Sequence, residues 1–542
     1  MKELTNAPNL NFADFTAAVE QFTYLHETRQ IDSGQKIYRE LIPQKTPGPG
    51  QQYAFEVDLD KCTGCKACVT ACHNENGLEE DETWRSVGFI QGGTSANPVI
   101  QHITTACHHC ADPACMTGCP TKAYTKDETT GIVKHLDDQC FGCQYCILKC
   151  PYDVPKYNKK KGIVHKCDMC IGRLSAGQPP ACVRACPNGA IRIVLVERNE
   201  VRKNFKEFVN VPDAPASNYT YPTTRYTTKK QFPRNMVSAD YLIVSPEHSH
   251  PPLVVMLVLT QLSVGTFGAQ ILLKKLMNAE LNHLLFPFHA WIALGAGLLA
   301  LAASVFHLGR PLYAFRAVLG LKTSWLSREI LAFGVFASLA VIYVLGLRSE
   351  VMSYAVFLTG LIGVLCSVMV YKDTRRPFWD NHGTTFKFLI TTALLGLATS
   401  LGLSVMYTSI RQPEDVSSLM FSFGRLFVMG IAGLSVVKMG WEAMIFRFLK
   451  KDDGNFFKKT AVLMTRPLKK YTLARFAAGI CGGMILPLLI FAVEPNSPQA
   501  SLRLAGYSFV MLVILIVAEM LERYLFFRAV VSLKMPGGIV GK

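Results

Sequence analysis

The chain has 542 residues and a formal net charge of +16. This length allows two or three domains. Half of the residues are hydrophobic, and they are concentrated after residue 250, whereas residues 1–250 are polar and rich in cysteine. Much of the basic excess lies in short loops between apolar runs, as is typical of membrane proteins, so we do not expect nucleic acid as a partner. The composition predicts a soluble domain followed by a membrane domain.

The first 50 residues form a polar extension, which ends at a break over Pro47–Gly50. One short helix is expected over 11–26. The first 30 residues contain neither the apolar core of a secretory signal nor a twin-arginine pair. We therefore expect no export signal in this segment.

Residues 51–197 are predicted to form one domain, which contains 16 of the 18 cysteines in four groups of four. Two-residue gaps suit a cubane cluster, because one tight loop then supplies three thiolates and the fourth comes from elsewhere in the chain. The spacing predicts four [4Fe–4S] clusters in two ferredoxin-like pairs with an α+β fold. The groups are Cys62, Cys65, Cys68 and Cys72; Cys107, Cys110, Cys115 and Cys119; Cys140, Cys143, Cys146 and Cys150; and Cys167, Cys170, Cys182 and Cys186.

Zinc and disulfides are the alternatives for these cysteines. An all-cysteine zinc site uses two cysteine pairs with a longer gap between them. The fourth group fits that pattern, whereas the first and third groups do not. Disulfides do not suit a domain that we expect in the cytoplasm. The remaining cysteines, Cys366 and Cys481, lie in apolar runs and are expected to be small core residues.

Residues 198–250 are predicted to be a connector that lies along a surface, because they are rich in Pro, Thr, Tyr and Asn. Residues 251–530 are predicted to form an all-α bundle of about eight membrane helices, and 531–542 a tail. Each apolar run is near the roughly 20 residues that a helix needs to cross a bilayer. Buried helices of a soluble protein are the alternative, which eight consecutive runs disfavour. The runs are about 252–273, 288–306, 329–347, 352–371, 387–409, 418–446, 471–493 and 504–527.

Eight spans place both ends of the membrane domain on the side of the cysteine domain. That side carries 20 Lys and Arg residues, and the opposite side carries 5. The positive-inside rule therefore predicts a multi-pass protein of the cell (inner) membrane with a cytoplasmic cysteine domain. A reporter fused to the C-terminus that was active only outside the cytoplasm would contradict this orientation.

Three segments of the cysteine domain, 107–115, 166–170 and 180–187, resemble the iron–sulfur subunit of dimethyl sulfoxide reductase, a molybdopterin oxidoreductase. The resemblance implies four-iron clusters throughout, because no cysteine is replaced, and a separate molybdopterin-containing catalytic subunit as partner. It also implies that the first and fourth groups share two clusters and the second and third groups share the other two. The implied ligand sets are Cys62, Cys65, Cys68 and Cys186; Cys72, Cys167, Cys170 and Cys182; Cys107, Cys110, Cys115 and Cys150; and Cys119, Cys140, Cys143 and Cys146.

The segments 307–311 and 324–329 resemble the anchor subunit of the same reductase, within the polysulfide reductase membrane-subunit superfamily. The resemblance implies that two usually separate subunits are fused here, and that His307, Glu329 and Arg310 belong to a quinol site. A histidine can titrate near neutral pH, and a carboxylate at a span end can pass protons to water. The residues alone leave other roles open: a helix cap for His307, a helix N-terminal charge for Glu329 and a lipid anchor for Arg310.

Ionisable residues inside the spans are further candidates for function. Lys438 and Glu442 are four residues apart on one helix, and pairing with each other is the simpler explanation for both. Glu519 and Glu522 lie near the cysteine-domain end of the last span, and Arg425 lies in the opposite half of its span. No charged relay crosses the membrane in the sequence, so we do not expect proton pumping.

Haem is also not expected. His289 and His307 are 18 residues apart, about 27 Å along one helix, so they cannot ligate one haem.

The sequence and the resemblance together predict electron relay between menaquinol or another membrane quinone and the catalytic subunit. Two alternatives remain: the same module delivering electrons from a substrate to quinone, and a structural or ion-translocating subunit of a larger respiratory assembly.

Overall fold

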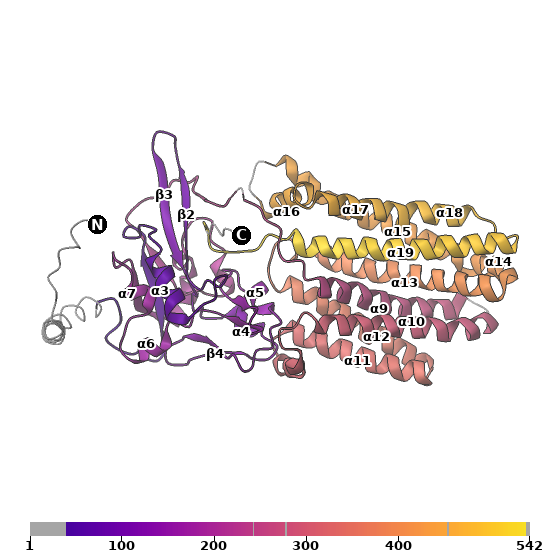
Figure 1. Ribbon diagram of the computed structural model, residues 1–542, viewed down its shortest axis with the longest axis horizontal. Helices are drawn as coiled ribbons and strands as arrows, with labels where there is room; N and C mark the ends of the chain where they lie inside the picture. Colours follow the sequence, from indigo (N-terminus) through magenta and orange to yellow (C-terminus); the bar gives the residue numbers. More distant parts are fainter. Residues whose placement is uncertain (1–39, 242, 277–278, 452–454, 538–542) are drawn as a thin grey trace, which may run out of the picture.

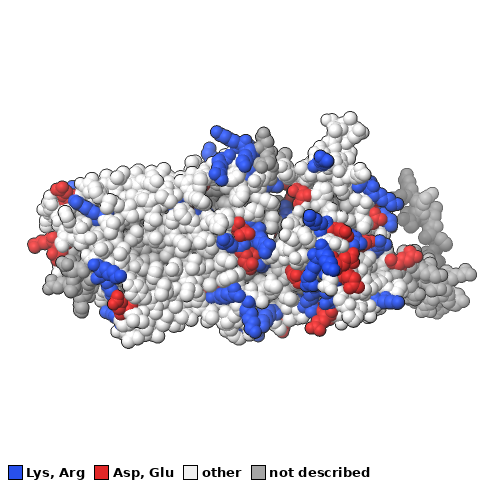
Figure 2. Space-filling model, turned by 180° about the vertical axis from the view of Figure 1, so that it is seen from behind, with Lys and Arg blue, Asp and Glu red and all other residues white. Residues whose placement is uncertain are grey.

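The computed structural model describes residues 40–241, 243–276, 279–451 and 455–537. The helix expected over 11–26 lies outside these residues. The molecule is elongated, with the cysteine-rich domain at one end and a bundle of long helices at the other (Figure 1). On the face shown in Figure 2, charged side chains gather over the cysteine-rich domain and at the far end of the bundle, and few lie over its middle. This distribution fits a bundle whose sides contact lipid.

The cysteine-rich domain is built on two three-stranded sheets. In the first sheet, β1 (Gln51–Asp58) pairs antiparallel with β8 (Ile191–Glu197) and parallel with β9 (Arg225–Thr227). In the second sheet, β2 (Ser86–Gly93) and β3 (Pro98–Thr105) form an antiparallel hairpin that projects from the domain (Figure 1), and β10 (Val237–Ser238) pairs with β2. Two further hairpins join β4 (Tyr124–Lys126) to β5 (Val133–His135) and β6 (Lys156–Asn158) to β7 (Ile163–His165). Helices and mixed sheets confirm the predicted α+β ferredoxin-like fold.

The connector over 198–250 is more than a surface tether, so that part of the prediction was wrong. It begins with α8 (Arg198–Lys203) and supplies both β9 and β10. Its side chains Val209, Val211 and Tyr226 are buried in the core of the cysteine-rich domain. Its apolar residues are scattered among Pro and Thr without a period. The sequence therefore does not indicate that extended segments of the connector are buried by pairing with distant strands.

The chain returns to the cysteine-rich domain after the last membrane helix. The N–H of Phe89 on β2 donates to the carbonyl oxygen of Gly537 at 3.3 Å, and the N–H of Gly537 donates to Asp240 at 3.3 Å. Lys534 pairs with the same Asp240 carboxylate, and Met535 is buried in the domain core. The tail therefore closes the domain edge that the connector leaves open.

Within the described residues, eight helical segments are long and apolar enough to cross a membrane, which confirms the predicted number. Their boundaries differ from the predicted runs by a few residues at each end. The sixth and seventh spans are interrupted by single π-helical turns, Met420–Gly424 and Cys481–Ile485. The spans are α9 (Pro251–Leu276), Leu285–Val305 of α10 (Ala279–Val305), α11 (Trp325–Leu345), α12 (Glu350–Lys372), α13 (His382–Arg411), Pro413–Lys450 with α15 (Arg425–Ala443), Lys469–Ala492 with α17 (Lys469–Ile480) and α18 (Leu486–Ala492), and α19 (Pro498–Arg528).

Helices α9 and α13 run through the middle of the bundle and are its most buried spans. Their backbones meet at two glycines. A Cβ atom on Gly265 would lie 1.9 Å from the carbonyl oxygen of Thr392, and a Cβ atom on Gly396 would lie 2.3 Å from the backbone of Gly265. Small residues at such a crossing let two membrane helices pack at backbone contact.

The cysteine-rich domain sits on one end of the bundle, and polar contacts hold the two together. The Tyr145 hydroxyl donates to the carbonyl oxygen of Val370 at 2.9 Å, and Lys149 forms an ion pair with Asp373 at 2.7 Å. The backbones touch at Gly309, where a Cβ atom would lie 2.1 Å from the carbonyl oxygen of Gly162. The junction therefore fixes how the loop over 140–150 sits on the bundle.

Candidate functional site

The first and third cysteine groups adopt the same local backbone. Gly64 and Gly142 both have φ of 75°, and two residues later Lys66 and Gln144 have φ of 64° and 61°. In each group a short helix follows at once, α3 (Ala67–Asn76) or α5 (Tyr145–Lys149). Left-handed residues curl the chain tightly, and glycine adopts this conformation without a steric cost. Each loop can thereby present three thiols to one side.

The second and fourth groups use a different device, a proline-led helical turn. Cys115 lies in α4 (Ala114–Thr117) and Cys182 in α7 (Ala181–Arg184), and a proline precedes each helix. The last cysteine of each group accepts a backbone hydrogen bond: Ala123 N–H donates to Cys119 Sγ and Ala190 N–H donates to Cys186 Sγ, both at 3.2 Å. Such bonds hold the sulfur in place and stabilise a thiolate.

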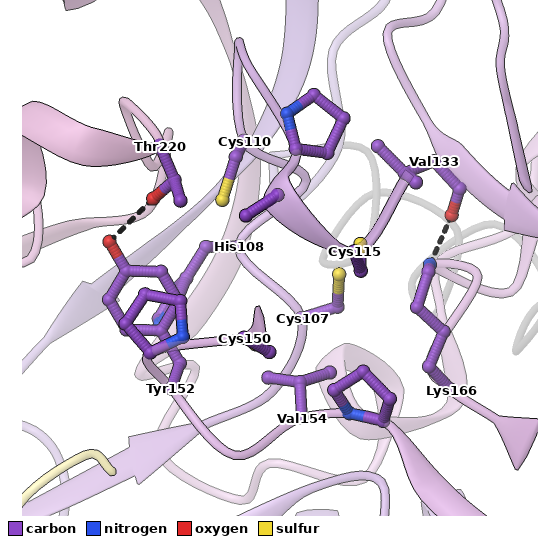
Figure 3. Close-up of a pocket in the computed structure, with 14 residues that line it drawn as sticks. Cys107, His108, Cys110, Cys115, Val133, Cys150, Tyr152, Val154, Lys166 and Thr220 are labelled. Carbon is purple, nitrogen blue, oxygen red and sulfur yellow. Dashed lines mark hydrogen bonds between the residues drawn. The ribbon is translucent and has the colours of Figure 1, made fainter. Parts of the chain in front are cut away.

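Two ligand sets implied by the resemblance each surround a cavity. One cavity has four thiols in its lining, together with Tyr152 and Lys166 (Figure 3). The other also has four thiols in its lining. The thiols are those of Cys107, Cys110, Cys115 and Cys150 in the first cavity, and those of Cys119, Cys140, Cys143 and Cys146 in the second.

The other two sets are also close neighbours. Burial raises the pKa of the Cys62 thiol, and Cys68, Cys186 and Cys65 add to the effect. Burial raises the pKa of Cys72 to about 12. Among the neighbouring thiols, Cys182 adds most to this shift, and Cys170 also contributes. The structure thus brings together the members of all four sets, and the assignment of one cluster to each set stays a prediction.

The cysteines of two sets line cavities. Within the described ranges, no group of three or more His, Cys, Asp or Glu side chains is placed to hold a single metal ion. A tetrahedral zinc site needs four ligand atoms within about 2.3 Å of one centre. A cubane binds one thiolate at each of four iron corners, so it fits a cavity lined by four thiols. The geometry favours iron–sulfur clusters over zinc.

His307 lies just after α10 and contacts the cysteine-rich domain. It hydrogen-bonds the backbone of Cys143, and its ring centroid lies 4.9 Å from that of His250. Burial lowers the pKa of His307 to about 4, although the bond to Cys143 partly opposes this shift. Burial likewise lowers the pKa of His250 to about 3. Burial therefore favours the neutral form of both imidazoles, which can accept a proton or a hydrogen bond.

Glu329 lies in the first turns of α11 with 5 % of its surface exposed, and Ser367 on α12 donates to its carboxylate. Glu329 is also among the neighbours that, after burial, raise the pKa of Tyr145. The hydrogen bonds described for Glu329 and His307 do not join the two directly. Instead the segment from Cys143 to Tyr145 reaches both, with Cys143 at His307 and Tyr145 near Glu329.

Arg310 is directed toward the cysteine-rich domain. Its Nε donates to the carbonyl oxygen of Lys161 at 3.2 Å, and its Nη1 donates to that of Asp137 at 2.9 Å. Its backbone N–H donates to the carbonyl oxygen of Phe141 at 3.0 Å. The side chain thus binds two backbone carbonyls near the third cysteine group.

The membrane bundle contains an ionic network that the sequence analysis missed. Lys438 lies 3.9 Å from Glu442, as the spacing suggested, but its closer partner is Glu519 on α19. Arg475 on α17 pairs with Glu442 at 3.0 Å and with Glu519 at 3.1 Å. The expectation of a self-contained pair on one helix was incomplete, because the partners lie on three helices that are far apart in sequence.

The same network continues toward the cysteine-rich domain. Lys387 on α13 pairs with Glu522 at 3.0 Å, and Arg523 contacts the same carboxylate. Arg523 also donates to the side-chain oxygen of Gln261 on α9 at 3.1 Å. The spacing of Glu519 and Glu522 was the available signal, whereas nothing local in the sequence marked Arg475 as their partner.

Comparisons with known proteins divide the chain as the fold does. Residues 247–528 match the family model of the DMSO reductase anchor subunit. Residues 99–196 match a 4Fe-4S dicluster domain, and residues 53–74 match a 4Fe-4S binding domain. The match to the anchor model covers more than half of the chain.

The curated relatives each match about a third of the chain. The B subunit of anaerobic dimethyl sulfoxide reductase from Haemophilus influenzae is 35% identical over 181 residues, which is 32% of this chain and 87% of the relative. The B subunit of the same reductase from Escherichia coli strain K12 is 36% identical over 179 residues, 32% of this chain and 86% of the relative. Hydrogenase-2 operon protein HybA of Escherichia coli O157:H7 is 36% identical over 223 residues, 35% of this chain and 66% of the relative. The chain therefore belongs to the dimethyl sulfoxide reductase family of iron–sulfur and anchor subunits, and it is a membrane-anchored iron–sulfur electron-transfer subunit that joins both parts in one polypeptide.

Proposed function

We propose that this chain carries electrons from a membrane quinol, menaquinol in the first instance, through four [4Fe–4S] clusters to a separate molybdopterin-containing catalytic subunit. One observation carries the proposal: the loop that holds Cys143 reaches both His307 and Glu329 at the end of the bundle. A lipid-soluble donor bound there lies next to the first cluster site. The catalytic partner is inferred from the family resemblance.

The four cysteine sets form a continuous series leading away from the bundle. Tyr124 lies beside both Cys146 and Cys115, which belong to the two sets nearest the bundle. Cys167 lies beside Cys107, which belongs to the inner set that also contains Cys115, and beside Cys72 of its own set. Cys72 in turn lies beside Cys68 of the outermost set. When bound, each [4Fe–4S] group accepts and releases one electron at a time.

Quinol oxidation releases two electrons and two protons, so the chain must accept both. The neutral imidazole of His307 supplies an acceptor for one quinol hydroxyl proton. The carboxylate of Glu329, held by Ser367, supplies a second group one short segment away. Released protons leave on the side of the cysteine-rich domain. Arg310 binds carbonyl oxygens of that domain, so its contacts favour a docking role over direct contact with quinol.

The side of the membrane follows from charge. The junction side of the bundle carries most of the loop lysines and arginines, and positive loops favour the cytoplasm. We place the iron–sulfur domain in the cytoplasm on this basis. A C-terminal reporter that was active only outside the cytoplasm would overturn this part of the proposal.

The substitution His307→Ala tests the quinol site. We expect the purified variant to keep about 16 irons per chain, as four cubanes require, and to lose reduction of its clusters by a menaquinol analogue. His382→Ala is the matched control, because His382 is an exposed histidine at the start of α13 on the same end of the bundle. The control should retain both properties.

Two outcomes would contradict the proposal at different points. Unchanged quinol-dependent reduction in His307→Ala would remove this histidine from the site. An iron content of about 8 per chain in the unmodified protein would refute half of the ligand scheme.

A further inference from the structure

Arg85 is a buried cation in the centre of the cysteine-rich domain. It directly precedes β2, and 2 % of its surface is exposed. Its Nη1 donates to the Thr104 hydroxyl at 3.1 Å, and its guanidinium lies 4.7 Å from the centroid of the Phe55 ring. Its Nε and Nη2 are fully buried and have no oxygen or nitrogen acceptor among the residues that the structure describes.

In the part of the chain that the structure describes, Arg85 forms no ion pair with a carboxylate. The nearby buried acid Glu82 is occupied by Trp84, Asn158 and His165. An isolated cation is strongly disfavoured in a low-dielectric interior, so a buried arginine needs an anion beside it.

The groups that surround Arg85 are thiols from two different ligand sets. Burial alone lowers the pKa of Arg85, but nearby sulfur atoms reverse that shift and raise it. Arg85 also lies within hydrogen-bonding reach of the Cys182 thiol. The contributing sulfurs are those of Cys182, Cys167 and Cys72, which share one set, and that of Cys68, which belongs to the outermost set.

From this geometry we infer that Arg85 is a shared internal counter-ion of the two outer clusters and that it raises the reduction potentials of both. The inference rests on the proposed function only in taking these two sets to hold clusters. Four thiolates give a bound cubane a net negative charge, which grows by one on reduction. A fixed positive charge between two such groups stabilises the reduced form of each, and burial keeps solvent from screening it.

A second buried cation occupies the next gap toward the bundle. Lys166 is 3 % exposed and donates to the carbonyl oxygens of Val133 and Cys167, the latter at 2.8 Å. It lies beside Cys107 and Cys115 of one set and Cys167 of the next. In the gap nearest the bundle the corresponding position is taken by Tyr124, a neutral phenol. Lys149, which is buried beside the two inner sets, is balanced by its ion pair with Asp373. Among the residues described, Arg85 and Lys166 are thus buried cations of the two outer gaps that have no ion pair, and their charge favours movement of electrons away from the membrane.

The test is a redox titration of the full-length protein, followed by electron paramagnetic resonance, with iron content measured in the same samples. Arg85→Gln removes the charge and keeps hydrogen-bonding capacity. Arg85→Lys keeps the charge. Arg192→Gln is the matched control, because Arg192 lies on β8 in the same domain with its side chain 54% exposed and paired with Glu56.

We expect Arg85→Gln to keep its iron and to shift two of the four potentials to more negative values, while the other two stay unchanged. Arg85→Lys and the control should leave all four near those of the unmodified protein. An iron-replete Arg85→Gln protein with four unchanged potentials would overturn the inference. If Arg85→Gln loses iron, the lysine variant decides: full iron and normal potentials support the counter-ion role, and loss of iron or shifted potentials refutes it. Low iron in the unmodified protein would instead count against the four-cluster proposal.

Discussion

The two halves of this chain bury cations in opposite ways. In the membrane bundle, Lys438 and Arg475 contact carboxylates from neighbouring helices, so their charge is balanced by the chain itself. In the cysteine-rich domain, Arg85 and Lys166 are equally buried, and neither forms an ion pair within the described residues. The bundle can therefore be stable by its own residues, whereas the buried cations of the cysteine-rich domain need a bound anionic group.

Removal of iron should give the largest difference between the two halves. A chelator with a reductant strips the cluster sites, leaves Arg85 without a counter-ion and leaves the thiols unlinked. We expect the cysteine-rich domain to unfold, because binding of a structural metal group is coupled to folding. The bundle should stay helical. Hydrogen exchange of the two halves measures this, and equal loss of protection in both would show that the cysteine-rich domain depends on iron no more than the bundle does.

The substitution Glu519→Ala should have the next largest effect, confined to the bundle. It leaves Lys438 without its closest partner and removes one of two carboxylates from Arg475. Breaking a buried pair by removing one member costs about 3–5 kcal/mol. We expect the free energy of unfolding in detergent to fall by that amount while iron content stays normal.

A double variant provides the control for that prediction. Lys438→Met combined with Glu519→Leu removes both charges, and replacement of a whole buried pair by apolar residues is often nearly neutral. A double variant as unstable as Glu519→Ala would show that side-chain packing, and not charge balance, stabilises the bundle at this position.

The smallest effect is expected at the junction between the halves. Lys149 is buried and pairs with Asp373, which keeps 29% of its side chain exposed. Lys149→Met leaves a carboxylate that water can reach, so we expect a loss of about 1–2 kcal/mol, between the values for surface and buried pairs. Arg202→Met, which removes an exposed pair with Asp112, should cost roughly 0–1 kcal/mol. Denaturant unfolding of both variants distinguishes them, and equal losses would contradict a stabilising role for the junction pair.

The features that the sequence predicted are those encoded over short stretches of chain. The cysteine groups are defined by spacing within short segments, and the spans by continuous apolar runs, so both were found. The missed features join residues that are distant in sequence. Arg475 and Glu519 meet across two helices, and Arg85 lies outside every cysteine group, so no local pattern marked them.

Two outcomes show where local patterns stop being informative. The richness of the connector in Pro, Thr, Tyr and Asn predicts that it lies along a surface, yet Tyr226 and its neighbours are buried by pairing with β1. The ligand sets required the family resemblance, because spacing alone leaves open which group supplies the fourth thiol of each cluster. The fold class and the number of spans were predicted without the family resemblance and without knowledge of which distant segments pair.

The return of the chain from α19 to β2 sets an order of events during synthesis. The edge that pairs with Gly537 is made of residues near 89 and 240, which leave the ribosome hundreds of residues earlier. That edge can be completed only after every membrane helix has been translated. Final closure of the redox domain therefore follows synthesis of the whole anchor, which links maturation of one half to translation of the other.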